Sequence, residues 1–187
     1  MPQRRFLQKG YKARKYKENE EFKGMIKILF VCHGNICRSP MAEFIMKDMV
    51  EKAGLADQFY IASAATSTEE IWNGVGNPVY PPAREKLAEY GISCEGKRAV
   101  QLTRADYEKY DYLLGMENRN ISNMLRILGA DPKGKVCRLL DYTKHPRDIA
   151  DPWYTGDFDS TYDDIREGCE AFLPKLTQDE MSYLRRN

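Results

Sequence analysis

The segment from Cys32 to Ser39 contains residue types that could together carry a chemical reaction. Backbone N–H groups of a loop that leads into a helix bind a phosphate-like anion, and the helix dipole adds to this attraction. The same field favours a thiolate over a thiol, so Cys32 can act as a nucleophile. The guanidinium of Arg38 matches two oxygens of a phosphoryl group. This combination predicts the transfer of a phosphoryl group to sulfur.

The other residues of the loop are expected to shape it and to contact the bound anion. Gly34 lets the backbone approach the ligand closely. Asn35 can fix the loop by hydrogen bonds, and the Ser39 hydroxyl can donate to the Cys32 sulfur. We therefore assign substrate binding to the loop residues besides Cys32 and Arg38, namely His33, Gly34, Asn35, Ile36, Cys37 and Ser39.

Two elements must hold this loop in place. The apolar run at residues 26–31, before the loop, is typical of a strand buried on both faces of a parallel sheet. After the loop, Ser39 is predicted as the N-cap of a helix with Pro40 at its first position, and apolar residues recur at helical spacing as far as Ala53. The loop is therefore expected at a helix N-terminus.

Strand and helix patterns alternate along the rest of the chain. The predicted strands are 59–64, 112–116 and 136–140, and the predicted helices are 83–90, a short one near 105–107, 119–128 and 162–176, with a long loop at 66–82. This alternation indicates an α/β fold, a four-stranded parallel sheet with helices on both faces in a Rossmann-like three-layer arrangement. Ligands bind beyond the carboxyl ends of such strands, where the phosphate-binding loop after the first strand is expected.

The C-x5-R loop from Cys32 to Arg38, followed by Ser39 and Pro40, resembles that of the low-molecular-weight protein tyrosine phosphatases. The resemblance implies a phosphatase that hydrolyses phosphotyrosine through a cysteinyl-phosphate intermediate, without a metal or cofactor. It extends over about residues 25–176, because further segments follow in that family's order: 63–67, 112–116 and 151–156.

A leaving phenolate is helped by a proton in the transition state, and Asp151 is the candidate acid. Pro152 favours an extended backbone at Asp151, which lets the carboxyl project from a loop. The alternative is an ordinary Asp-Pro turn. Trp153 and Tyr154 can form the apolar wall of a cleft that is deep enough for phosphotyrosine and too deep for phosphoserine.

The roles of residues at two other places in the chain stay open. Trp72, in the long loop, could cover one face of an aryl substrate or serve as a buried anchor. The sequence also departs from some members of the family at residues 95–101, which leaves open whether Lys97 or Arg98 braces the active-site loops.

Three other functions compete with this interpretation. Protein arginine phosphatases have a similar scaffold but carry Thr where this loop has Ile36, whose apolar side chain favours an aryl ring. Arsenate reductases pass a disulfide outward through two further cysteines, and Cys94 has no partner within a few residues. A non-catalytic phosphate-binding domain predicts loss of Cys32, Arg38 or Asp151, and all three are present.

The five cysteines, an odd number in a chain without a secretory segment, indicate a reducing compartment, and we expect a cytoplasmic protein. Cys32 and Cys37 could form a reversible disulfide on oxidation, as the resemblance also implies, and this would protect Cys32 from over-oxidation. The alternative is that Cys37 packs as a small apolar side chain. We expect no metal site, because the cysteines and histidines lack ligand spacing.

Charge divides the chain into unequal parts. Residues 1–24 hold eight Lys or Arg and three Glu, a net charge of +5, which leaves 21 basic and 25 acidic residues, or −4, for the remainder. We expect a disordered extension over 1–24, a phosphatase domain over 25–180 and a tail over 181–187. The extension lacks the apolar run of a signal peptide or membrane span. We expect no binding of nucleic acid unless the basic and aromatic residues of this extension provide it. The resemblance implies tyrosine-phosphorylated proteins, and a tyrosine kinase, as partners.

Overall fold

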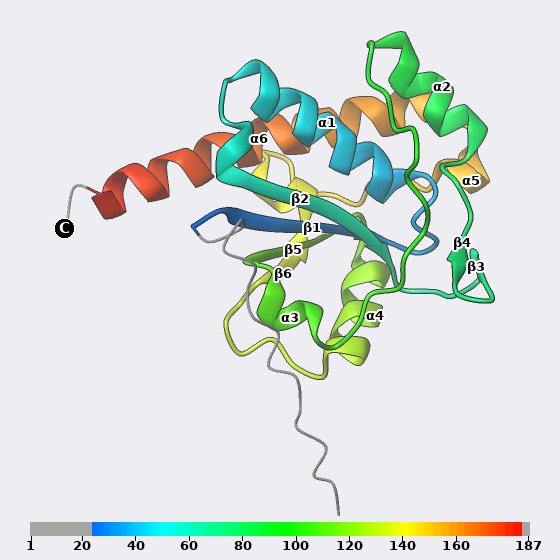
Figure 1. Ribbon diagram of the computed structural model, residues 1–187, viewed down its shortest axis with the longest axis horizontal. Coiled ribbons are helices and arrows are strands. Elements are labelled where there is room, and N and C mark those ends of the chain that lie inside the picture. Colours follow the sequence, from blue (N-terminus) through cyan, green and yellow to red (C-terminus); the bar gives the residue numbers. More distant parts are fainter. Residues whose placement is uncertain (1–23, 185–187) are drawn as a thin grey trace, which may run out of the picture.

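The computed structural model describes residues 24–184, and a parallel sheet lies at its centre (Figure 1). The strand order is β2-β1-β5-β6, and each neighbouring pair is parallel. The four strands are β1 (Ile26–Cys32), β2 (Phe59–Ala65), β5 (Tyr112–Gly115) and β6 (Val136–Arg138). The predicted four-stranded parallel sheet is therefore confirmed.

Helices cover both faces of this sheet, so the predicted three-layer arrangement is also confirmed (Figure 1). One face carries α1 (Arg38–Lys52), α2 (Pro81–Glu89) and α6 (Phe158–Leu184), and the other carries α3 (Asp106–Lys109) and α4 (Asn118–Leu128). The smaller elements are α5 (Pro152–Thr155), the 3-10 turns η2 (Ala56–Gln58) and η3 (Leu139–Tyr142), and a hairpin of β3 (Ile71–Trp72) and β4 (Val75–Gly76).

Strand β1 is buried on both faces, as its apolar run predicts. Ile28, Phe30 and Cys32 belong to the apolar cluster on the α1 and α6 side, whereas Leu29 and Val31 belong to the cluster on the α4 side. This alternation is the two-residue period of a strand. Full burial of one such large apolar side chain contributes about 1.5–3 kcal/mol, so both clusters fix the position of β1. The strand thereby delivers Cys32 to one edge of the sheet.

The strand register gathers the ends of three strands at that edge. Across the β1–β2 pair, Cys32 lies opposite Ala65, and across the β1–β5 pair, Val31 lies opposite Gly115. The carboxyl ends of the three strands therefore lie next to one another. The loop after β1 joins α1 directly, which places it at the helix N-terminus, as predicted.

The predicted N-cap of α1 is wrong. The helix begins at Arg38 with Cys37 at the N-cap position, and no side chain caps it. Ser39 lies inside the first turn, and its hydroxyl is turned inward to within 3.0 Å of the Cys32 sulfur. The contact with the loop has therefore taken the hydroxyl that would otherwise have capped the helix.

Several other boundaries also differ from the prediction. The predicted loop at 66–82 contains the β3–β4 hairpin and the start of α2 at Pro81. Strand β6 ends at Arg138 instead of Leu140, because Leu139 and Leu140 turn into the core in η3, where both are fully buried. Helix α6 extends in both directions beyond 162–176 and runs from Phe158 to Leu184. The expectations for residues 1–23 and 185–187 lie outside the described residues.

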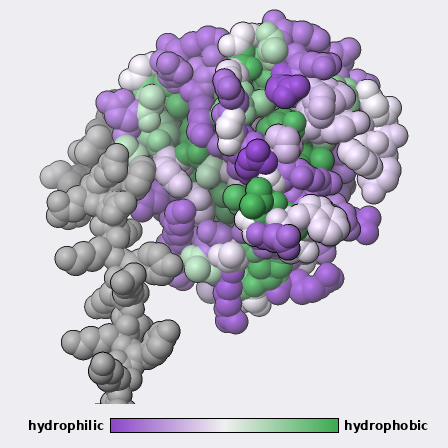
Figure 2. Space-filling model, turned by 45° about the vertical axis from the view of Figure 1, so that its right-hand side comes forward, coloured by the Kyte–Doolittle hydropathy of each residue, from purple (hydrophilic) through white to green (hydrophobic). Residues whose placement is uncertain are grey.

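Figure 2 brings forward the side of the molecule on which β1 ends. Hydrophilic side chains cover most of this face, and hydrophobic ones form patches among them. Within residues 24–184, no helix is both long and apolar enough to cross a membrane.

Candidate active site

The loop between β1 and α1 closes around the sulfur atom of Cys32. The N–H of Asn35 donates to this sulfur at 3.3 Å, and the Ser39 hydroxyl oxygen lies 3.0 Å from it. Asn35 has φ +57°, a left-handed conformation that Asn tolerates better than most other residues. Its buried amide donates to the hydroxyls of Ser39 at 2.8 Å and Ser63 at 2.9 Å. These bonds hold the loop in its curled conformation.

A buried carboxylate lies behind the loop. Ser63 donates from its hydroxyl to Glu43 Oε2 at 2.5 Å, and Lys97 Nζ lies 3.3 Å from the same oxygen. Lys97 also donates to the carbonyl of Ser63 at 3.0 Å, whereas Arg98 donates to the carbonyl of Gly76. Of the two basic residues, Lys97 is therefore the one that braces the loop after β1, through Ser63 and Glu43. Sequence analysis missed Glu43, whose only signal is its position one helical turn after Ser39.

Arg38 points into the site from the first turn of α1 and is 1% exposed. Its Nη1 donates to Glu117 Oε2 at 3.1 Å and to the Ile149 carbonyl at 2.9 Å, and its Nη2 donates to Asp151 Oδ2 at 2.8 Å. Burial acts to lower the pKa of Arg38, but the negative charges of Cys32, Asp151 and Glu117 outweigh it and raise that pKa. The guanidinium therefore stays charged. Sequence analysis missed Glu117.

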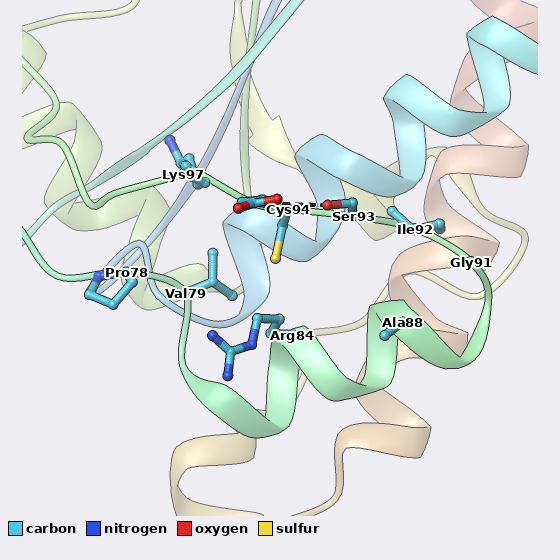
Figure 3. Close-up of a pocket in the computed structure, with 11 residues that line it drawn as sticks. Pro78, Val79, Arg84, Ala88, Gly91, Ile92, Ser93, Cys94 and Lys97 are labelled. Carbon is cyan, nitrogen blue, oxygen red and sulfur yellow. Dashed lines mark hydrogen bonds between the residues drawn. The ribbon is translucent and has the colours of Figure 1, made fainter.

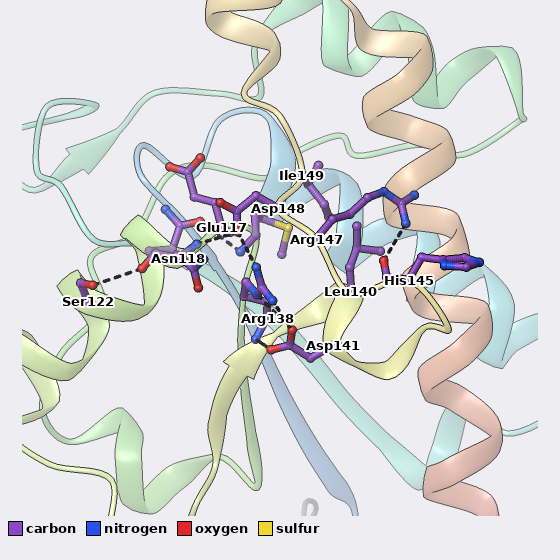
Figure 4. Close-up of polar contacts among 12 residues, drawn as sticks. Glu117, Asn118, Ser122, Arg138, Leu140, Asp141, His145, Arg147, Asp148 and Ile149 are labelled. Carbon is purple, nitrogen blue, oxygen red and sulfur yellow. Dashed lines mark hydrogen bonds and ion pairs between the residues drawn. The ribbon is translucent and has the colours of Figure 1, made fainter.

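The segment before Asp151 is anchored to neighbouring elements (Figure 4). The Ile149 N–H donates to the carbonyl of Met116, just after β5, at 2.9 Å. Asp148 accepts a hydrogen bond from the N–H of Asn118 and another from Arg138 Nη1, both at 2.9 Å. These contacts hold the segment against β6 and the start of α4 (Figure 4). The position of Asp151 therefore depends on residues that are distant in sequence.

Asp151 occupies the N-cap position of α5. Its backbone is extended, with φ −79° and ψ 114°, as Pro152 predicts. One carboxylate oxygen accepts from the N–H of Trp153 at 3.1 Å, and the other faces Arg38. The carboxyl thus combines a helix cap with a place in the site, so the alternative of an ordinary turn does not account for its contacts.

A cavity of about 140 Å³ lies beside the loop and is lined in part by Cys32. Asn35 and Ser39 are fully buried and do not line it. Trp72 lies outside the lining and is 72% exposed, so the interpretation as a buried anchor is wrong. The predicted site residues that do line the cavity are Cys32, His33, Gly34, Ile36, Cys37, Arg38, Asp151, Trp153 and Tyr154, joined by Glu69 and Glu70, which sequence analysis missed.

Aromatic side chains form one wall of this cavity. Trp153 and Tyr154 are 55% and 83% exposed, so their rings are available to a bound molecule. The Trp153 ring packs on Tyr80 with ring centroids 5.1 Å apart, which supports its orientation. The apolar side chain of Ile36 lines the cavity from the loop.

Cys37 lines the same cavity as Cys32, but its environment is different. Burial raises the pKa of the Cys37 thiol, and the charges of Cys32 and Asp151 raise it further. Cys37 therefore stays a neutral thiol. The two loop cysteines differ in their chemistry, since the contacts from Asn35 and Ser39 go to the Cys32 sulfur.

A larger cavity of about 540 Å³ lies between α2 and residues 91–97 (Figure 3). The Cys94 thiol and the Arg84 guanidinium point into it (Figure 3). Burial raises the pKa of Cys94, which outweighs the opposing charge of Arg84. Neither Cys32 nor Asp151 lines this cavity, and both line the smaller one. In the described part of the chain, no cluster of three or more His, Cys, Asp or Glu side chains could hold a metal ion.

A parallel α/β sheet whose first strand ends in a C-x5-R loop, with an aspartate facing the arginine, defines a cysteine-dependent phosphatase. Comparison with known proteins gives the particular family. The family model described as low molecular weight phosphotyrosine protein phosphatase matches residues 27–182. The chain belongs to this family, and it is a protein-tyrosine phosphatase that uses a cysteine-based mechanism.

Individual relatives agree with the family match. The low molecular weight protein-tyrosine-phosphatase YfkJ of Bacillus subtilis is 37% identical over 158 residues, which cover 83% of this chain and 99% of YfkJ. PtpA of Staphylococcus epidermidis is 31% identical, and the match covers 83% of this chain and 96% of PtpA. The crystal structure of YfkJ has a TM-score of 0.77 over 83% of this chain and 96% of its own. The crystal structure of the Streptococcus pyogenes phosphatase SP-PTP is 37% identical and has a TM-score of 0.71. The match covers 81% of this chain and 93% of SP-PTP.

Proposed function

We propose that Cys32, Arg38 and Asp151 are the residues that catalyse phosphotyrosine hydrolysis. In the first step the Cys32 thiolate attacks phosphorus in line, and the bond from phosphorus to the tyrosyl oxygen breaks. Asp151 gives its proton to the leaving oxygen. Arg38 and the loop N–H groups hold the other phosphoryl oxygens as charge shifts between them. The products are tyrosine and a cysteinyl-phosphate.

The second step removes the phosphoryl group from sulfur. Asp151, now a carboxylate, takes a proton from a water molecule, whose oxygen attacks phosphorus. The bond between sulfur and phosphorus breaks, which returns the Cys32 thiolate and releases inorganic phosphate. Neither step requires a metal or a cofactor.

The convergence of three groups on one cavity supports this assignment. Cys32, Arg38 and Asp151 line the same cavity, although Arg38 and Asp151 are 113 positions apart in the chain. A phosphoryl group bound to Arg38 would replace the contact between Nη2 and Asp151. The released carboxyl could then turn toward the leaving oxygen.

Matched peptides that carry phosphotyrosine, phosphoarginine or phosphoserine test the substrate class. We expect phosphate release from phosphotyrosine to be faster by a factor of about one hundred or more, or about 2.7 kcal/mol, because Ile36, Trp153 and Tyr154 offer apolar surface to the ring. A preference for phosphoarginine would contradict the role of Ile36 but not the cysteine mechanism. Turnover of none of the three peptides would contradict both.

We also propose that Cys37 protects Cys32 against irreversible oxidation. Peroxide converts the Cys32 thiolate to a sulfenic acid, and the Cys37 thiol then displaces water from that sulfur to form a disulfide. A dithiol reductant restores both thiols. The support is that both side chains are buried and line one small cavity.

A peroxide pulse followed by a dithiol reductant tests this protection. We expect the wild-type protein to recover most of its activity and Cys37→Ser to recover several-fold less, because its Cys32 sulfenic acid proceeds to the irreversible sulfinic acid. Intact-mass measurement should show loss of two hydrogens in the oxidised wild type. Equal recovery of the two proteins would rule out the protective role.

The cellular setting is also a proposal. We propose that the phosphatase unit spans residues 25–180 and acts in the cytoplasm on tyrosine-phosphorylated proteins, whose modification a tyrosine kinase supplies. The odd number of cysteines and the need for a reduced Cys32 support a reducing compartment. Fractionation of cells that express the full chain tests the location, and its recovery outside the cytoplasm would contradict it. Limited proteolysis tests the domain boundaries.

A further inference from the structure

We infer that the rim of the active site selects phosphotyrosines that lie in basic sequences, and that Glu69 is the specificity-determining residue. The inference rests on the proposed catalytic site and adds a substrate class to it. The residues that carry it are two adjacent carboxylates at the mouth of the 140 Å³ cavity, Glu69 and Glu70.

The two carboxylates differ in how they are held. Glu70 accepts a hydrogen bond from Asn77 Nδ2 at 2.7 Å, and it lies close enough to the loop that a Cβ on Gly34 would be 3.1 Å from its Cγ. Glu69 points toward solvent, with 72% of its side chain exposed, and its Oε2 lies 2.9 Å from Nε2 of His33. Glu70 therefore forms part of the wall, whereas Glu69 can contact residues of a substrate outside the phosphate site.

The charges of the cavity lining are unevenly distributed. Arg38 is its one arginine, lies buried at the base and is committed to the phosphoryl group, and the lining has no lysine. Among the lining residues at the mouth, the only basic side chain is the half-exposed His33, which contacts Glu69. Residues 25–187 add a net charge of −4. A substrate with Lys or Arg beside the phosphotyrosine meets opposite charge at the rim, and an acidic substrate meets repulsion.

Exposed aromatic side chains near the site favour the same kind of substrate. Trp153 and Tyr154 line the cavity and are largely exposed, so the aliphatic stems of Lys and Arg can pack on them and their charged ends can lie over the rings. An acidic side chain gains neither contact. The charge of the rim and its apolar surface therefore both favour a substrate with basic residues beside the phosphotyrosine.

The chain provides a suitable probe in its own sequence. Tyr11 lies within QKGYKARK, residues 8–15, which has four basic residues and no acidic one. A synthetic peptide of these residues with phosphate on Tyr11 is the basic substrate. The same peptide with each Lys and Arg replaced by Glu is its acidic counterpart.

The experiment compares kcat/KM for these two peptides in the full-length protein at low ionic strength. We expect the wild type to favour the basic peptide about tenfold, a typical sum for several exposed charge contacts, and the ratio to fall as salt is added. Glu69→Lys should remove or reverse the preference, and Glu69→Gln should reduce it. The control is Glu51→Lys, which makes the same charge change at an exposed position near the end of α1, about 20 Å along that helix from Arg38. It should keep the wild-type ratio.

The outcomes separate this inference from the catalytic assignment. If the wild type hydrolyses both peptides equally well, selection by the rim is wrong, while the assignment of Cys32, Arg38 and Asp151 is unaffected. If the wild type has the preference and Glu69→Lys retains it in full, Glu69 is not the residue responsible. If neither peptide is hydrolysed, the proposed catalytic site itself fails.

Discussion

Replacing Cys32 by serine should lower kcat for a phosphotyrosine peptide by at least about 10⁴-fold. A hydroxyl is not ionised near neutral pH, so it needs a base to become a nucleophile. The groups that contact this position are the Ser39 hydroxyl and the N–H of Asn35, and neither can take a proton from serine at neutral pH. Continuous measurement of released phosphate gives the rate.

Cys137→Ser is the matched control for this variant. Cys137 lies on β6, outside the cavity, and contacts the Tyr142 hydroxyl at 3.6 Å, a contact that serine can also make. Its activity should stay near that of the wild type. Because the loop and Arg38 remain in place, Cys32→Ser should still bind the peptide. Retention of more than about one hundredth of the wild-type rate by Cys32→Ser would exclude Cys32 as the nucleophile.

Asp151→Asn should lower kcat for a phosphotyrosine peptide by about 10²- to 10³-fold, the range for loss of a general acid. Asparagine has the same shape, and its one carbonyl oxygen can accept the hydrogen bond from the Trp153 N–H, so the cap of α5 is preserved. Its NH2 group then takes the place of the oxygen that faces Arg38. What asparagine lacks is a transferable proton. The loss should therefore be large for a tyrosyl leaving group and small for an aryl phosphate whose phenol is strongly acidic.

Rates with a series of aryl phosphates check this dependence on the leaving group. Asp157→Asn provides the control, because Asp157 caps the first turn of α6 through the N–H of Ser160 at 2.8 Å and does not line the cavity. The rates of Asp157→Asn should depend on the acidity of the leaving phenol in the same way as the rates of the wild type. An equal loss across the whole series in Asp151→Asn would mean that Asp151 orients Arg38 and does not donate the proton.

The local signals in the sequence were sufficient for the catalytic loop. The apolar run of β1, the spacing from Cys32 to Arg38 and the apolar periodicity of α1 are contiguous, so each can be recognised without knowledge of the fold. The extended backbone at Asp151 likewise follows from the neighbouring Pro152. The N-cap of α1 was wrong because a tertiary contact, from Ser39 to the Cys32 sulfur, overrode the local preference for a cap.

The surroundings of the loop could not be predicted in the same way. Glu43 has the spacing of an ordinary helical surface residue, and its role appears only when β2 brings Ser63 next to it. Glu117 has no motif, yet it lies 3.1 Å from Arg38. The β3–β4 hairpin was missed because its strands have only two residues each, too few for a periodic pattern.

The sequence alone determined that this protein has an α/β fold with the Cys32 thiol in a loop at the N-terminus of a helix, because those features arise from neighbouring residues. The tertiary structure decided what faces Arg38. Its partners Glu117 and Asp151 are 79 and 113 positions away. Their approach depends on the register of the sheet and on the anchored segment before Asp151, and many residues must pack together before either contact forms.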